Sequence, residues 1–593
     1  MRIALRPAIV GALVVTALRI AYLMWFCPYD LIEDEAQYWL WSQHLDWSYY
    51  SKGPGIAWAI ALSTRLFGDA EWAVRLPAAA SGLMAMVCAA GLGGEAAIAS
   101  GKDARAVTRA ALFGMAAFAL ASVFQATSLL ITIDGPLVAC WLLAAWAGWR
   151  AMMRGSRSAW LLLGAAVGAG FLFKYTMLLV LPGLIGFAVA RRGGLHFAAG
   201  WRVWALGGAA IALLGAVPVV VWNAQHDWDT VRHLLGHMGM AGGDMPVART
   251  GAGGGSSRWS LIRPLVLMAS QVALAGPALA LGVVVAVRAR RESMGGSGAF
   301  LAWVAAPVLG FYLIVSVFVE PEGNWPIAGA TTLLVLAGVW ASGVPCRVSR
   351  RDGREHGQDG RVTDARATRL WRFSPRRFLW NLSVIFGVFS ALVLLRADLA
   401  AAGVSWVIQR PAVVRLVESM GGEAKPIRVG RLIGARAMGA HAGRLLAELD
   451  AERAMRSGPK SRATKDRAFV IVEHYGRASQ LSYYLRERHS AAPDAPLVCC
   501  ASAEMGGRRS QFDLWPHTSL RKPELLGRDA LLLSNDKPHT LEFWEAIFES
   551  VERATESGKL GGEHKKDRVA YIGRGYRGLT TPALRAQAPG TRP

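Results

Sequence analysis

The apolar stretch PAIVGALVVTALRIAYLMWFC, residues 7–27, runs directly into PYDLIEDEAQYWLW, residues 28–41. The first stretch has the length of roughly 20 residues that a helix needs to cross ~30 Å of hydrocarbon. The second contains three consecutive acids, Glu33, Asp34 and Glu35. A carboxylate beside hydrocarbon is costly, so this cluster is a candidate functional site. The alternative is that it marks only the polar end of a helix.

Similar apolar runs recur as far as residue 395, in a chain of 593 residues that is 53% hydrophobic and 18% charged. A soluble protein of this size carries more charge. We therefore predict a polytopic α-helical membrane protein with about 11 transmembrane helices in residues 1–395. The expected spans are 7–27, 76–98, 110–126, 136–150, 159–173, 175–190, 201–222, 263–287, 299–319, 326–343 and 378–395.

The net charge of +23 raises the question of nucleic-acid binding. The arginines lie in short loops between apolar runs and in the basic segment 344–377, which is the pattern of cytoplasmic membrane loops. This distribution excludes a nucleic-acid partner and predicts a cytoplasmic N-terminus. We expect residues 7–27 to be a retained helix, with a cleaved signal peptide as the alternative. The six cysteines show neither metal spacing nor a disulfide framework.

Three polar regions lie on the opposite side in this topology: the loops 28–75 and 223–262 and the tail 396–593. Within the first loop, residues 55–67 are too short to span and predict a helix in the membrane interface, or a re-entrant plug. In the tail, residues 468–474, 496–501 and 529–534 read as buried strands around a helix-like stretch. This order predicts a C-terminal soluble α/β domain.

The same side gathers the residues that suggest chemistry. Lys52, Arg75 and Lys174 are cations near apolar segments, and phosphate is their natural partner, although snorkelling to the interface is the alternative. Asp134 precedes Gly-Pro and is either a site residue or a helix cap. The further candidates for substrate contacts are Tyr38, His226, Trp228 and Glu322.

The order of these motifs resembles a known family. The matching segments are Asp34-Glu35 with Tyr38, Tyr49-Tyr50-Ser51-Lys52-Gly53-Pro54, Phe67-Gly68 with Arg75-Leu76-Pro77, Thr132-Ile133-Asp134-Gly135-Pro136, and Phe173-Lys174. Residues 20–340 look like bacterial glycosyltransferase family 39 and related GT-C membrane enzymes. These include protein mannosyltransferases, the aminoarabinose transferase of lipid A and lipid A galacturonosyltransferases.

The resemblance implies a GT-C fold and transfer of a sugar from a polyprenyl-phosphate donor. The expected acceptor is a membrane lipid, a glycolipid or a protein, at the periplasmic face of the bacterial inner membrane. Asp34 matches the general base, and Glu35 is the runner-up on proximity. Lys52 and Lys174 match lysines near the donor phosphate, Asp134 matches a second acidic position, and Tyr38 matches the motif tyrosine. A single displacement would invert the anomeric centre.

Ser51 is a departure, because lipid A transferases commonly carry a glutamate at that position. We therefore assign no metal ligands, while a divalent metal cofactor stays open. The rival function is a transporter or flippase of a lipid-linked glycan. A transporter would show internal repeats and polar residues near the midplane. The sequence shows no repeat, and its polar residues gather at one face, so an enzyme is favoured.

Overall fold

The computed structural model describes residues 2–238, 240, 242–244, 260–292, 296–344, 375–411, 414, 429–457, 467–486, 498–534, 538–554 and 569–579. The chain divides into two compact units. The helical unit comprises residues 1–22, 76–218 and 253–394. The mixed unit comprises residues 23–75, 219–252 and 395–593. Most of the basic segment 344–377 falls outside the described residues.

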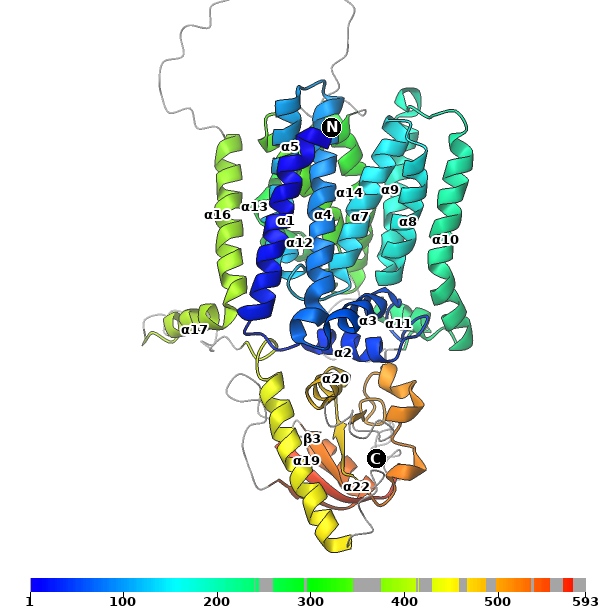
Figure 1. Ribbon diagram of the computed structural model, residues 1–593, viewed down its shortest axis with the longest axis vertical. Coiled ribbons are helices and arrows are strands. Elements are labelled where there is room, and N and C mark those ends of the chain that lie inside the picture. Colours follow the sequence, from blue (N-terminus) through cyan, green and yellow to red (C-terminus); the bar gives the residue numbers. More distant parts are fainter. Residues whose placement is uncertain are drawn as a thin grey trace, which may run out of the picture. The chain divides into compact units, whose positions relative to one another are not determined.

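The helical unit is built from long apolar helices that run side by side (Figure 1). Their bounds are α1 (Arg2–Trp25), α4 (Glu71–Ala99), α5 (Ala104–Ala119), α6 (Ser122–Ala126), α7 (Asp134–Met153), α8 (Ser158–Phe173), α9 (Val180–Ala190), α10 (Trp201–Gln225), α12 (Ile262–Ala275), α13 (Pro277–Glu292), α14 (Ser297–Phe318), α15 (Ile327–Ala341) and α16 (Pro375–Leu395). Four of these helices, α1, α4, α10 and α16, belong to the helical unit only in part.

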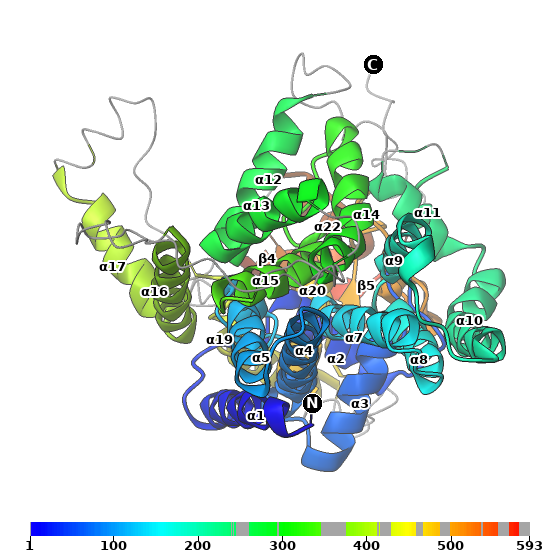
Figure 2. The same cartoon turned by 90° about the horizontal axis from the view of Figure 1, so that it is seen from above.

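Helix α15 lies at the centre of this unit, in contact with α5, α7, α13 and α14 (Figure 2). It is buried continuously from Ile327 to Val339, as expected of a helix that is apolar on all sides. Glycines bring other helices close together. A Cβ at Gly164 of α8 would collide with the Gly208 carbonyl of α10. The small residue at this position therefore permits close contact between α8 and α10.

Six helices among the described residues are long and apolar enough to cross a membrane, and seven if one bent pair counts as a span. The prediction of about 11 is therefore not confirmed. Several predicted spans correspond to apolar helices that are shorter, among them Ser158–Phe173 and Ile327–Ala341. The prediction of one helix over 263–287 is wrong: α12 and α13 are separate helices bent by 118°. The bend occurs at Gly276, whose φ of 83° lies in the left-handed region.

The mixed unit contains a five-stranded sheet in the order β2-β1-β3-β5-β4. The strands are β1 (Phe469–Val472), β2 (Val498–Cys500), β3 (Ala530–Ser534), β4 (Phe548–Arg553) and β5 (Val569–Tyr576). Strand β1 pairs in parallel with β2 and β3, and β5 pairs antiparallel with β3 and β4. The first three strands fall in the predicted segments. Strands β4 and β5 were not predicted; β4 is largely exposed and carries no buried apolar run.

Helices α19 (Ala435–Ser457), α20 (Tyr475–Tyr484) and α22 (Pro538–Ile547) accompany the sheet. The mixed unit also contains α2 (Glu33–Gln43), α3 (Gly55–Phe67), α11 (Asp229–His237) and α17 (Ala397–Ile408). Helix α3 matches the predicted helix at 55–67. Helix α2 packs against α20. The tail therefore shares one compact unit with the loop 28–75 and with much of the loop 223–262.

Candidate functional site

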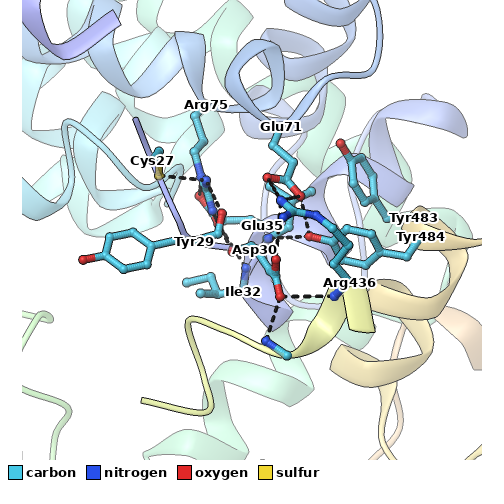
Figure 3. A network of polar contacts seen from close by, with 12 residues as sticks. Cys27, Tyr29, Asp30, Ile32, Glu35, Glu71, Arg75, Arg436, Tyr483 and Tyr484 are labelled. Atoms are coloured by element: carbon cyan, nitrogen blue, oxygen red, sulfur yellow. Dashed lines mark hydrogen bonds and ion pairs between the residues drawn. The ribbon is translucent and has the colours of Figure 1, made fainter. Parts of the chain in front are cut away.

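The acidic cluster is organised by a buried ion pair between Glu35 and Arg75 (Figure 3). Arg75 Nε donates to Glu35 Oε1 at 2.9 Å and Nη2 donates to Oε2 at 2.7 Å. The side chain of Glu35 is 0% exposed and that of Arg75 is 1% exposed. Arg75 also donates to the carbonyls of Tyr29 and Asp30 at 3.0 and 2.8 Å. Every nitrogen of this guanidinium therefore has an acceptor within the mixed unit.

Asp30 and Glu71, which the sequence analysis did not single out, hold the same segment from its other side. Asp30 Oδ2 accepts from the backbone N–H groups of Gly434 and Arg436 at 2.7 and 3.1 Å. Glu71 accepts from Arg436 and from the Tyr484 hydroxyl, at distances of 2.7 to 2.9 Å. These partners come from the tail, more than 350 residues away in the chain, so no local sequence signal reports them.

The three consecutive acids have three different environments. Glu33, Asp34 and Glu35 form the first turn of α2, where carboxylates interact favourably with the helix dipole. Glu35 Oε2 also accepts from the backbone N–H of Ile32 at 3.0 Å, which closes the helix N-terminus. Glu33 lies 3.5 Å from Arg477 Nε. Asp34 is the exposed member of the triplet.

Aromatic residues shape the turn that follows α2. The Trp41 and Tyr49 rings stack at 4.5 Å with an interplanar angle of 8°, and Tyr38 meets Trp41 edge-on at 5.4 Å. The Tyr49 hydroxyl donates to the Trp41 and His44 carbonyls. Residues 49–52 close a tight turn through two backbone hydrogen bonds between Tyr49 and Lys52. This turn fixes the backbone of the half-buried Lys52.

A polar chain starts at the next tyrosine. The Tyr50 hydroxyl donates to Asp244 Oδ2, which also accepts from His233 Nδ1 at 2.9 Å. Arg508 Nη2 contacts both nitrogens of the His233 ring. The members come from the first loop, the second loop and the tail, and all lie in the mixed unit. Of the residues around this polar network, the sequence had pointed only to Lys52 and to the second loop.

The surroundings lower the pKa values of both the histidines and the carboxylate in this polar network. Burial lowers the pKa of His233 to about 4, with the positive charges of Arg508 and Lys52 adding to the effect against Asp244. The pKa of His237 falls to about 3, again by burial first and then by His233, Arg508 and Lys52. Hydrogen bonds from His233 and Tyr50 hold the pKa of Asp244 at about 2. The imidazoles are therefore neutral and the carboxylate is ionised at neutral pH.

The predicted residues of the second loop lie at its entrance. His226 stacks on Trp222 at 4.0 Å, and its Nδ1 contacts the Trp222 carbonyl at 2.8 Å. Trp228 has φ of 58°, Asp227 has φ of 50°, and the Trp228 side chain is 49% exposed. Two consecutive left-handed residues other than glycine are costly, and such strain concentrates at functional sites. The strain presents the Trp228 ring to solvent.

In the helical unit, Lys174 and Asp134 form a second buried pair. Lys174 Nζ donates to Asp134 Oδ1 at 2.8 Å, with the side chains 13% and 3% exposed. Asp134 Oδ2 accepts from Asn324 Nδ2 at 2.7 Å. Asp134 is the first residue of α7, which Ile133 precedes as the N-cap residue, and its side chain contacts Lys174 and Asn324. Glu322 is exposed, and its charge acts on Lys174.

Within the described residues, no group of three His, Cys, Asp or Glu side chains could hold a metal ion. Ser51, in the first loop, supplies no carboxylate. We therefore derive no step from a metal.

The fold fits the GT-C membrane fold. It is similar to ArnT from Cupriavidus metallidurans bound to undecaprenyl phosphate, with a TM-score of 0.57 and 17% identity over 97% of this chain and 98% of that chain. The apo state of the same protein gives a TM-score of 0.53 at 17% identity, over 95% and 98% of the two chains.

Sequence comparison points the same way. Residues 51–222 match the family described as dolichyl-phosphate-mannose-protein mannosyltransferase. The chain is 31% identical over 315 residues to the lipid A galacturonosyltransferase RgtD of Rhizobium johnstonii, which covers 52% of this chain. It spans 60% of the length of that relative. These findings confirm the resemblance to GT-C glycosyltransferases that the motifs indicated.

Proposed function

We propose that the chain is an inverting membrane glycosyltransferase that moves a sugar from a polyprenyl-phosphate donor to a lipid, glycolipid or protein acceptor. Two relatives support this proposal: one is described as a lipid A galacturonosyltransferase, and the other was solved bound to undecaprenyl phosphate. The observation that carries it is the exposure of Asp34 on a helix turn whose neighbour Glu35 is fully buried. The proposed location is the bacterial inner membrane, with a cytoplasmic N-terminus and reaction at the periplasmic face.

In this reaction Asp34 takes the proton from the acceptor hydroxyl while that oxygen attacks the anomeric carbon of the donor. The bond from the anomeric carbon to the phosphate oxygen breaks, and the phosphate leaves with the bonding electrons. Lys52 and Lys174 are proposed as cations that stabilise the charge developing on the phosphate. One displacement inverts the anomeric centre.

The buried pair changes the proposed roles of two residues. Because Glu35 and the donors of Arg75 are occupied by one another and by backbone groups, we assign them to positioning Asp34. Asp134 is proposed to orient Lys174. Tyr38, His226, Trp228 and Glu322 remain proposed substrate contacts, with the exposed Trp228 ring suited to stacking on a sugar.

The test uses the full chain in lipid nanodiscs and in proteoliposomes, with a panel of undecaprenyl-phosphate sugars and lipid A or peptide as acceptor. We expect sugar transfer with at least one donor. Movement of a donor between leaflets without transfer would favour the rival flippase function. The absence of both transfer and donor binding would contradict the proposal.

A further inference from the structure

Arg508 is an arginine of the tail that reaches residues of both loops in the mixed unit. Its Nη2 contacts the ring of His233, which is 0% exposed. Its Nε is buried and has no hydrogen-bond partner. A buried donor left without an acceptor is costly. In the part of the chain that the structure describes, the partner of Nη2 is the neutral imidazole of His233, and no carboxylate pairs with this guanidinium at two points as Glu35 does with Arg75.

The surroundings of Arg508 are rich in positive charge. The charges of Arg508 and Lys52 both act on His233 and His237, whose rings lie 4.6 Å apart. Among the described residues, Asp244 is the acid whose charge acts on this group; its Oδ2 is engaged by Tyr50 and His233, and its Oδ1 is buried without a hydrogen-bond partner. The described charges that act on the two imidazoles are therefore two positive and one negative. An added anion would offset the imbalance and accept from the guanidinium fork, which suits carboxylate and phosphate oxygens.

We infer that Arg508, in contact with the ring of His233, forms a subsite for a second anionic group of the donor, in addition to the phosphate attached to the sugar. This inference rests on the proposed function. The ligand chemistry is an anionic oxygen group from one of two sources: a carboxylate on the transferred sugar, as in a uronic acid, or the second phosphate of a diphosphate-linked donor. Arg508 is thus a residue that determines which donor is accepted.

The experiment compares the wild-type full chain with Arg508→Gln and Arg508→Lys. The matched control is Arg521→Gln, which changes an arginine of the same segment that is 61% exposed and lies 3.2 Å from Glu504. Three donors are used: undecaprenyl phosphate glucuronate, undecaprenyl phosphate glucose and undecaprenyl diphosphate glucose. Dissociation constants come from quenching of tryptophan fluorescence, and transfer is measured separately.

We expect Arg508→Gln to weaken one doubly anionic donor by about tenfold or more relative to undecaprenyl phosphate glucose, as for loss of a charge-assisted hydrogen bond. The donor that is weakened identifies the source. Arg508→Lys should retain part of the preference and Arg521→Gln all of it. Equal effects of Arg508→Gln on all three donors, or none, would overturn the inference and leave Arg508 as a structural contact.

Two further outcomes are separable. Binding with the expected preference but without transfer by the wild type would support the subsite and contradict the glycosyltransferase proposal. If Arg508→Gln does not fold, donor binding by the wild type tests the inference instead. It must then bind one doubly anionic donor at least about tenfold more tightly than undecaprenyl phosphate glucose. Equal binding of the three donors by the wild type would overturn the inference.

Discussion

Glu35 and Arg75 are 40 residues apart in the chain, yet they form a two-point ion pair from which solvent is excluded. The pair ties the first turn of α2 to the first turns of α4, with Asp34 beside it. Removing one partner of such a pair leaves a buried charge uncompensated. The arrangement therefore makes the position of Asp34 depend on a residue that need not touch substrate.

Glu35→Gln should lower the free energy of unfolding by about 3–5 kcal/mol, because the Arg75 charge stays buried without its partner. The measurement is thermal unfolding in detergent. The matched change Glu504→Gln removes a pair whose arginine is 61% exposed; it should cost about 0–1 kcal/mol. Similar losses for both variants would show that the buried pair does not stabilise the fold.

Asp34→Asn should reduce the rate of transfer by about 10² to 10⁴, because the amide cannot take the acceptor proton. Donor affinity and thermal stability should stay at the wild-type values. Glu33→Gln is the control: it neutralises the neighbouring acid, which is 36% exposed and lies near Arg477, and should retain most activity. Wild-type turnover by Asp34→Asn would remove Asp34 from the mechanism.

Asp134→Asn should destabilise the helical unit, because it leaves the Lys174 ammonium buried without a counter-charge. Adding Lys174→Gln should recover part of the loss. A double-mutant cycle on thermal unfolding should give a coupling energy of about 0.5–3 kcal/mol. Additive effects would indicate that the two groups do not interact in solution. Donor affinity of the double variant separately tests the proposed role of Lys174.

Gly276→Ala should destabilise the chain by more than about 1 kcal/mol, because a side chain is strained at φ 83°. The added Cβ would also lie 2.6 Å from the Phe386 ring. Phe386→Ala added to Gly276→Ala removes the collision but leaves the backbone strain, so recovery should be incomplete. Gly310→Ala in α14 meets no atom within 4 Å and should be neutral or stabilising. Equal stability of the two single variants would contradict the bend.

Acid should destabilise the mixed unit before its carboxylates titrate. His233 has a folded-state pKa of about 4, below its ordinary value of 6.5, so between these values the unfolded chain binds more protons. The stability contributed by His233 is therefore full above about pH 6.5 and falls towards pH 4, by up to ~1.4 kcal/mol per pH unit. His237, with its pKa lowered to about 3, adds a slope of the same sign. Thermal unfolding from pH 8 to 5 measures the total slope. His233→Gln should remove part of it, whereas His539→Gln, at an exposed position, should leave it unchanged.

The sequence by itself determined the class of fold and the motif set. Apolar runs, basic loops and the three buried strands are local patterns, since each follows from the composition and periodicity of neighbouring residues. The same information located the helix at 55–67 and the acidic turn that became the start of α2. It did not detect the bend at Gly276, because an apolar run of 25 residues looks the same whether straight or broken.

Only the tertiary structure decided which charged residues of the candidate site pair with one another. The motif match singled out Asp34 among the three consecutive acids, but only packing makes Glu35 buried and paired and Asp34 exposed. Arg75 and Lys174 both read as phosphate cations, yet one meets Glu35 and the other Asp134. Arg508 gave no local signal, because its neighbours come from loops 275 residues away. Charge interactions depend on distance and burial, and these are fixed only when distant segments fold together.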